Sequence, residues 1–317
     1  MTLHAPAAPM DAGRVCPTDY TYSPAVLNRA ADFAADTLYV VGGLYGNTQA
    51  LREIARMAAA DSATLVFNGD FHWFDAAPDW FADIEAGVAP HRALRGNVES
   101  EIARAGDVGA GCGCAYPPSV DQGVVTRSNE ILSALRANAD SAQRWRLAAL
   151  PMHLVAQVGP LRVGIVHGDA GALAGWRFAN DALDDPAGAN WRNEVRRLSV
   201  IDLFACTHSC LAALRDFVLP SGRMTVANNG ASGMPNFTGT TYGALTRISM
   251  RPSPHAPLYG MARDGVFIDA LPVAYDTQAF MARFLARWPE GSPAHVSYHA
   301  RIASGPAYDI ARARLRV

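Results

Sequence analysis

The sequence has no run of about 20 apolar residues, so it predicts no membrane-spanning helix. It also has no excess of basic residues. The 27 Lys and Arg against 29 Asp and Glu give a formal net charge of −2, so nucleic acid is not indicated as a partner and neither is an anionic membrane. Residues 1–14 lack the basic start and apolar core of a signal peptide, and we expect a cytoplasmic protein. The five cysteines are few and odd in number, which argues against a disulfide framework.

Internal repeats and low-complexity linkers are absent as well, so we expect a single compact domain, and its oligomeric state is left open. Prolines interrupt residues 1–36, which we interpret as an N-terminal arm. Residues 37–250 are expected to form the main domain, and residues 251–317 a C-terminal extension packed on it. Within that extension we predict one helix, around Phe280 and Phe284, and expect the tail that follows to be irregular or an edge strand.

Several short apolar runs end in polar residues of one chemical kind. The run from Leu65 to Phe67 leads into Gly69-Asp70, and the run from Leu161 to Val166 ends at His167. Such runs are typical of buried strands, whose carboxyl ends meet at one edge of an open α/β sheet. Carboxylate, amide oxygen, imidazole and thiolate groups are all ligands of divalent metals. The side chains expected to form a shared metal site are Asp70, Asn97, His167, Cys206 and His208.

The order of these motifs resembles the calcineurin-like metallophosphoesterases, in the branch with a short Gly-Asn motif. The resemblance covers about residues 37–250. It implies a four-layer α/β/β/α sandwich in which two mixed sheets are flanked by helices. The matching segments are Gly43-Leu44-Tyr45-Gly46-Asn47, Gly69-Asp70, Gly96-Asn97-Val98-Glu99, His167-Gly168, Ala205-Cys206-Thr207-His208 and the loop Asn228–Pro235.

The resemblance also implies two metal positions, and the sequence departs from the family pattern at both. Gly43 and Tyr45 stand where the family has the Asp and His of its first metal, which leaves only Asp70 and His208 there. For the second metal, Asp70, Asn97 and His167 are present, but Cys206 replaces a histidine. Cys206 is either a thiolate ligand or a small apolar residue packed behind the site. We therefore expect one divalent ion per chain, manganese, iron or zinc, with Asn97 both as ligand and as catalytic residue.

Other residues near these motifs have two interpretations each. His72 is either a ligand or general acid, or a packed histidine beside Trp73. Glu99 either acts at the site or caps the next helix. Cys112 and Cys114 form a soft-metal pair, a reactive pair or a buried pair.

The degenerate first motif at Gly42-Gly43 has two interpretations as well. The turn could present backbone N–H groups and the start of a helix to a phosphate, with Tyr45 and Asn47 as substrate-binding residues. Alternatively, the two glycines only relieve crowding beneath Tyr45.

The function implied by the resemblance is metal-dependent hydrolysis of a phosphoester, with a small phosphorylated substrate or phosphate as the partner. We expect weak activity on aryl phosphates, because Val98 stands where the family has its usual proton donor. The alternative is a pseudoenzyme that uses the same fold to bind a ligand or a protein partner.

Overall fold

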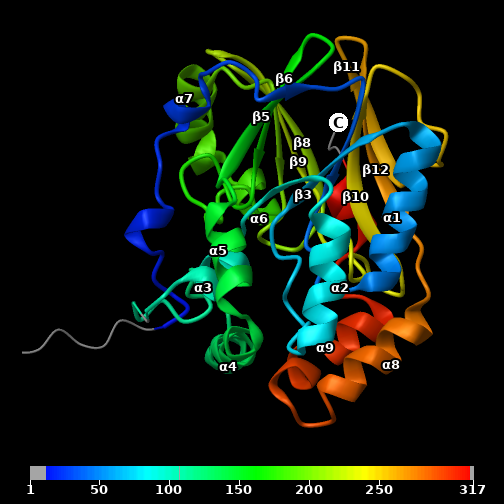
Figure 1. Ribbon diagram of the computed structural model, residues 1–317. Coiled ribbons are helices and arrows are strands. Elements are labelled where there is room, and N and C mark those ends of the chain that lie inside the picture. Colours follow the sequence, from blue (N-terminus) through cyan, green and yellow to red (C-terminus); the bar gives the residue numbers. More distant parts are fainter. Residues whose placement is uncertain (1–11, 107, 315–317) are drawn as a thin grey trace, which may run out of the picture.

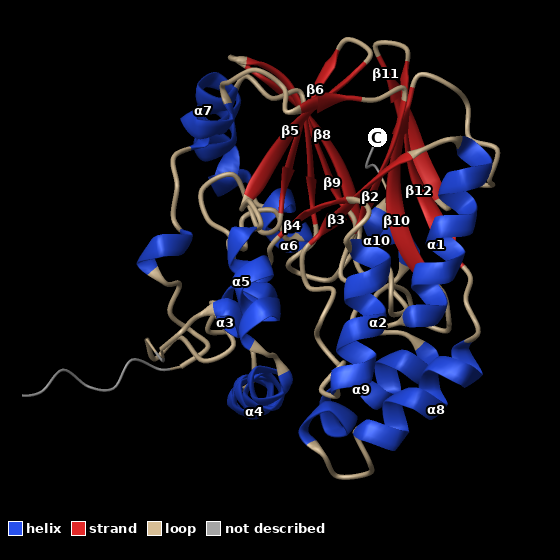
Figure 2. Cartoon of the chain, in the orientation of Figure 1, coloured by secondary structure: helices blue, strands red, loops and turns tan. Residues whose placement is uncertain are grey.

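The computed structural model describes residues 12–106 and 108–314. Two mixed sheets lie face to face at its centre, and helices cover them on both outer sides (Figures 1 and 2). The predicted four-layer α/β/β/α sandwich is therefore confirmed. None of the described helices is long and apolar enough to cross a membrane.

The first sheet has six strands in the order β11-β12-β10-β2-β3-β4 within the described part of the chain. Strands β2, β3 and β4 are parallel, whereas β10, β11 and β12 join by antiparallel pairing. The parallel strands end at the same edge, where the chain turns toward the site. The strand bounds are β2 Thr37–Val41, β3 Thr64–Asn68, β4 Arg92–Leu94, β10 Gly243–Ser249, β11 Tyr259–Arg263 and β12 Val266–Val273.

Among the described residues the second sheet also has six strands, in the order β1-β5-β6-β7-β9-β8. Strands β6, β7 and β9 are parallel, whereas β5 pairs antiparallel with β6 and β8 pairs antiparallel with β9. The short strand β1 comes from the N-terminal arm and pairs with β5, so the arm is docked on the sheet. The bounds are β1 Phe33–Ala34, β5 His153–Val158, β6 Leu161–Val166, β7 Leu203–Cys206, β8 Ala213–Leu219 and β9 Gly222–Asn228.

Helices α1 and α2 cover the first sheet, α7 covers the second, and α3, α4, α5, α8 and α9 gather at one end of the sandwich (Figure 1). The α-helix bounds are α1 Thr48–Asp61, α2 Pro78–Val88, α3 Asn97–Ala103, α4 Gln122–Asn138, α5 Ser141–Ala149, α6 Asn180–Asp184, α7 Ala189–Ser199, α8 Thr277–Arg287, α9 Pro293–Ser304 and α10 Ile310–Ala313. The 3-10 helices are η1 Thr18–Tyr20, η2 Pro24–Leu27 and η3 Pro186–Gly188.

Alternate residues along the strands enter different cores. In β7, Leu203 and Ala205 face the apolar layer between the sheets, whereas Phe204 and Cys206 face the core beneath α7. This alternation follows from the two-residue repeat of a strand, and it decides which polar side chains at the strand ends can reach the site.

The expectation of an irregular or edge-strand tail is wrong, because the tail contains α9 and α10. Helix α9 has ordinary boundary signals: Ser292 caps its start by accepting a hydrogen bond from the main-chain N–H of His295, Pro293 is its first residue, and Gly305 ends it. Its apolar face is short, with Ala294 and Ile302 buried, which is why hydrophobic periodicity alone does not reveal it.

Candidate metal centre

Four polar side chains from four strand ends meet at the end of the sandwich. Asp70 follows β3, Asn97 begins α3 after β4, His167 follows β6, and His208 lies two residues beyond β7. The ligand atoms of Asp70, His167 and His208 all lie within 4.8 Å of one another. The Oδ1 atom of Asn97 lies 3.1 Å from Nε2 of His167. All four residues are buried.

Main-chain carbonyls fix how the two histidines present their nitrogens. Nδ1 of His167 donates to the carbonyl of Asn68 at 2.8 Å, which leaves the Nε2 lone pair of the neutral ring facing the cluster. Nε2 of His208 donates to the carbonyl of Cys114 at 2.9 Å, which leaves its Nδ1 lone pair facing the same point. Partners of this kind are the usual supports of metal-binding histidines.

The other two ligand atoms are oxygens that also carry lone pairs. The Asn97 amide donates through Nδ2 to the carbonyl of Cys112 at 2.9 Å, so its Oδ1 points toward His167. The Asp70 carboxylate lies 3.4 Å from Nε2 of His167. Two oxygens and two nitrogens therefore converge with no proton between them in the neutral histidine forms. The lone pairs of these four atoms repel one another unless a cation lies among them.

The spacing of these atoms fits one metal ion. Ligand atoms about 2.1 Å from an ion at tetrahedral angles lie about 3.4 Å from each other. Nε2 of His167 lies 3.1 Å from both Oδ1 of Asn97 and Nδ1 of His208, and 3.4 Å from Oδ1 of Asp70. The donor set is thus suited to a divalent ion.

The pKa values of the cluster reflect the competition between a proton and a metal. Burial, together with the nearby His167, lowers the pKa of His208 to about 4, so its ring is neutral. Burial opposes a charge on His167, but the Asp70 carboxylate overcomes this and raises its pKa. Burial also opposes a charge on Asp70, and His167 and His208 nevertheless lower its pKa. Because a metal must displace the proton from His167, its affinity should fall as the pH is lowered.

Glu99 supports the site from behind rather than entering it. Its carboxylate accepts hydrogen bonds from the main-chain N–H groups of Gly96, Asp70 and Phe71 at 2.9, 2.8 and 3.0 Å. The capping interpretation of Glu99 is therefore correct, and its interpretation as a ligand finds no support in this placement. The cap ties the start of α3 to the Gly69-Asp70 turn, whose two residues have φ values of 77° and 55°. Holding Asp70 in this rarely adopted conformation requires such a support.

His72 points away from the cluster. Its ring is fully buried, stacks on Phe81 with centroids 3.7 Å apart, and pairs through Nδ1 with Asp75 at 2.5 Å. The structure thus supports the interpretation of His72 as a packed histidine rather than as a ligand or general acid. Burial alone would lower the pKa of His72, but the Asp75 carboxylate beside it raises the pKa to about 9.

The His72–Asp75 pair makes a prediction about stability and pH. A histidine whose pKa is raised on folding, here from 6.5 to about 9, stabilises the protein fully below pH 6.5 and loses that contribution as the pH rises through 9. The double variant H72Q/D75N removes both charges in similar shapes. Between pH 6 and pH 9.5 the wild type should lose about 3 kcal/mol of unfolding free energy relative to this variant. Urea unfolding at the two pH values measures this, and parallel profiles would contradict the pairing.

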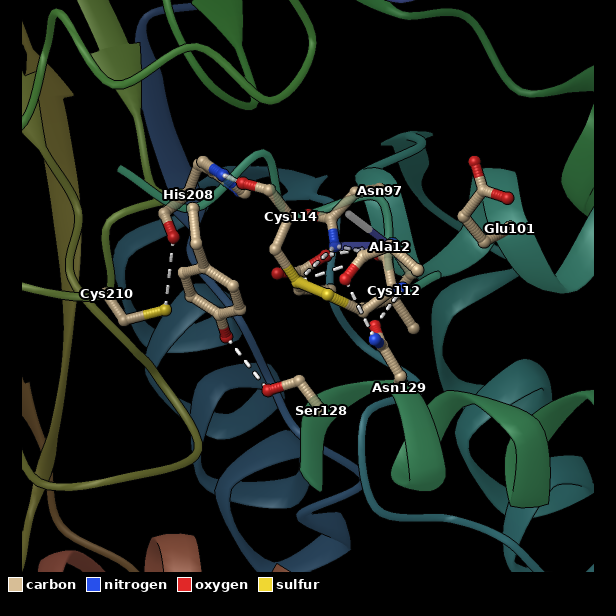
Figure 3. The surroundings of a disulfide bond; sticks show 12 residues. Ala12, Asn97, Glu101, Cys112, Cys114, Ser128, Asn129, His208 and Cys210 are labelled. Carbon is tan, nitrogen blue, oxygen red and sulfur yellow. Dashed lines mark hydrogen bonds between the residues drawn. A yellow bond between two sulfur atoms is a disulfide. The ribbon is translucent and has the colours of Figure 1, made fainter. Parts of the chain in front are cut away.

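Cys112 and Cys114 form a disulfide that lies directly beside the cluster (Figure 3). This disulfide, which joins residues two positions apart, was not expected from the sequence. The bonded loop supplies the carbonyls that hold Asn97 and His208, and the Cys114 carbonyl also accepts from Trp176 at 2.9 Å. The disulfide therefore shapes the loop that orients two of the four ligand side chains, and the thiols of the pair are not free to bind metal.

A cavity of about 150 Å³ opens onto the cluster. Five of its lining residues are tyrosine or tryptophan, and Asp70, Asn97 and His208 also lie in its lining. Sequence reasoning missed most of the wall. Trp176 comes from the loop after β6, and Tyr298 and Arg301 come from α9. The start and stop signals of α9 were the only clue in the sequence to the last two. The remaining lining residues are Tyr45, Trp73, Val98, Cys114, Tyr116, Ser209 and Cys210.

No protein-family model and no curated protein matches the sequence. Solved structures do match the fold. A metallophosphoesterase from Sphaerobacter thermophilus aligns with a TM-score of 0.51 at 14% identity, over 85% of this chain and 100% of that one. A hypothetical protein from Pyrococcus horikoshii OT3 aligns with a TM-score of 0.56 at 15% identity, over 86% of this chain and 99% of that one. The chain has the metallophosphoesterase fold. The resemblance inferred from the motifs is thus confirmed at the level of the fold.

Compared with the motif pattern of the metallophosphoesterases, the last motif is shifted in this chain. Cys206 was expected to replace the fourth ligand of the second metal, but it is absent from the cluster and fully buried beneath α7 with Phe178 and Val226. Burial also raises the pKa of its thiol well above the ordinary value. The structure therefore does not support Cys206 as a ligand and places it in the core. His208, expected at the first metal, lies in one cluster with Asp70 and His167.

The Tyr45 side chain packs directly over Gly43, the residue that stands in place of the aspartate of the family's first motif. A Cβ atom at Gly43 would lie 2.4 Å from Cε2 of Tyr45, so only glycine fits beneath the ring. The Tyr45 hydroxyl lies 2.5 Å from Sγ of Cys210. This supports the interpretation that glycine relieves crowding at this turn.

The alternative, an anion-binding turn, is weakened because three of the turn's N–H groups already have acceptors within the protein. The N–H groups of Gly43, Tyr45 and Gly46 donate to Thr207 Oγ1, Asp70 O and Phe71 O. Asn47 caps α1 by accepting from Gln49 and Ala50, and it is fully buried. Asn47 is thus a structural residue away from the cavity, whereas Tyr45 remains a cavity residue.

Proposed function

We propose that this chain is a metal-dependent phosphoester hydrolase that works with one divalent ion. The observation that carries the proposal is the convergence of four lone pairs, from Asp70, Asn97, His167 and His208, at the floor of an open cavity. The metallophosphoesterase fold supports the reaction class. The substrate is a small phosphorylated compound, because the cavity is below the roughly 300 Å³ of ordinary ligand sites.

These four residues would hold the ion, and their two nitrogens favour manganese, iron or zinc over magnesium, which prefers oxygen. When bound, a divalent ion polarises phosphoryl oxygens and makes a water nucleophilic near neutral pH. Asp70 balances part of the ion's charge, and the hydrogen bonds from Asn97 and His208 to the loop carbonyls keep their ligand atoms in place. The aromatic wall limits the access of bulk water.

The cavity offers no efficient proton donor for the leaving group. Val98 lines it where the family pattern has its donor. Burial raises the pKa of Tyr116 to about 12 and that of Tyr45 well above the ordinary value. Phenols with such pKa values donate poorly near pH 7. We therefore expect turnover to depend strongly on how well the leaving group departs without a proton.

The test is hydrolysis of aryl phosphates by metal-free protein to which one metal is added at a time. Manganese, ferrous iron or zinc should restore turnover of 4-nitrophenyl phosphate, whereas magnesium should not. Phenyl phosphate, which has a poorer leaving group, should be hydrolysed more slowly. Loss of a residue that only supports a metal ligand lowers activity by about 10- to 100-fold. D70N changes a direct ligand of the proposed site and should lower turnover by more than this. Equal turnover in D70N would assign the activity to a contaminant. Metal binding without any turnover would favour the pseudoenzyme.

A further inference from the structure

The C-terminal residues beyond the motif resemblance contribute directly to the cavity. Helix α9 packs against α4 and α8 at the end of the sandwich where the ligand side chains meet (Figure 1). Tyr298 and Arg301, one turn apart on α9, line the cavity together with Asp70 and His208. This segment therefore completes the wall opposite the strand ends.

Two hydrogen bonds hold the Arg301 guanidinium at this wall. Nε donates to the carbonyl of Pro235 at 3.1 Å, and Nη2 donates to the carbonyl of Cys210 at 2.7 Å. Cys210 lies two residues after His208, so the guanidinium is tied to the loop that carries a ligand. Within residues 12–106 and 108–314, no carboxylate forms an ion pair with Arg301, and both bonds leave Nη1 unused. A fixed guanidinium with a free edge is suited to a phosphate oxygen.

The charge of the cavity favours a dianion. Asp70 and Arg301 are the charged side chains of its lining, and their charges offset each other. A divalent ion held by Asp70, Asn97, His167 and His208 then leaves a net charge of about +2 in a small, largely buried space. A phosphate monoester carries nearly two negative charges at neutral pH, whereas a phosphate diester carries one.

We propose that Arg301 binds the phosphate of a small monoester and so makes the site selective for monoesters over diesters, an inference that rests on the proposed function. The alcohol part of the substrate is apolar or aromatic, because Trp73, Tyr116 and Trp176 line the cavity beside the ligand cluster.

The experiment compares wild type with R301Q and R301K, and uses R283Q as the matched control. Arg283 lies on the neighbouring helix α8 and pairs with Asp83 outside the cavity. Phosphate affinity is measured by calorimetry with inorganic phosphate, on protein with and without metal. Kinetics are measured with the monoester 4-nitrophenyl phosphate and the diester bis(4-nitrophenyl) phosphate. R301Q should weaken phosphate binding by about 10- to 100-fold, the range expected for a charge-assisted hydrogen bond. It should also lower the monoester-to-diester ratio of kcat/KM by about 10-fold. R301K should fall in between, and R283Q should match the wild type.

A purely structural role for Arg301 would lower the melting temperature and both kcat/KM values together, with the ratio unchanged, and would overturn the inference. If R301Q does not fold, the pH dependence of KM in the wild type still tests the inference. Its KM for the monoester should fall as the pH rises through about 6, where the phosphate becomes a dianion. A KM that is flat there would overturn the inference. Arg301-dependent phosphate binding without turnover would support the inference and contradict the proposed hydrolase, so the two outcomes are separable.

Discussion

Replacement of His208 by alanine should abolish metal binding and turnover together. In the proposed site His208 is one of four ligands, and its ring is fixed by the hydrogen bond from Nε2 to the Cys114 carbonyl. Loss of a residue that only supports a ligand lowers metal affinity by about 10- to 100-fold. Loss of a direct ligand should lower it further. Titration of the metal into metal-free protein in a calorimeter measures this affinity.

The matched control is C206A, two residues earlier in the same motif. Cys206 is buried in the core beneath α7, so its replacement should cost some stability through a small cavity and leave metal affinity unchanged. If C206A lost the metal and H208A kept it, the assignment of the fourth ligand to His208 would be wrong. Loss of affinity in both would place a thiolate in the site after all.

The double variant G43D/Y45H should gain a second metal ion and hydrolyse substrate faster than the wild type. In the wild type the Tyr45 ring fills the space above Gly43, and the atoms that a Cβ would meet are Cε2, Cζ and Oη. These are the outer atoms of the ring, and a histidine lacks them. Tyr45 has a φ of 55°, a conformation that histidine adopts more readily than most residues. A second ion would stabilise the transition state further, and we expect a gain of at least about 10-fold in kcat.

The single variants test the reason given for the glycine. G43D alone should be destabilised by about 1–3 kcal/mol, because its side chain meets the tyrosine ring, and Y45H alone should bind only one ion. Adding Y45H to G43D should restore much of the lost stability. Mass spectrometry of the metal content and urea unfolding follow both effects. A double variant that folds, binds one ion and keeps the wild-type rate would show that this turn cannot be rebuilt as a metal position.

The sequence was enough to predict the sandwich and all four clustered side chains, but it also included Cys206, which lies outside the cluster. Asp70, Asn97 and His167 follow short buried strands directly, so the strand pattern places them at one edge. Cys206 and His208 were harder to separate because both lie at the end of β7. The two-residue alternation sends Cys206 into the core with Phe204, and His208 reaches the site only after the chain has left the strand.

Two other features depend on long-range packing that the sequence did not indicate. Arg301 lies about 90 residues after His208, and only the fold brings α9 against the cavity. The carbonyls of Cys112 and Cys114 orient Asn97 and His208, and a loop rich in glycine gives no local sign of such a role. The cap by Glu99, in contrast, was one of two interpretations that the sequence already offered.

The measurement that tests the central claim most directly is the number of metal ions bound per chain. Metal-free protein is loaded with excess manganese or zinc, freed of unbound ions, and analysed by mass spectrometry alongside D70N and H167A. The account predicts one ion per chain in the wild type and essentially none in the two variants. Two ions in the wild type would show that the Tyr45 side chain does not close the first position, and no ion would contradict the metal centre itself.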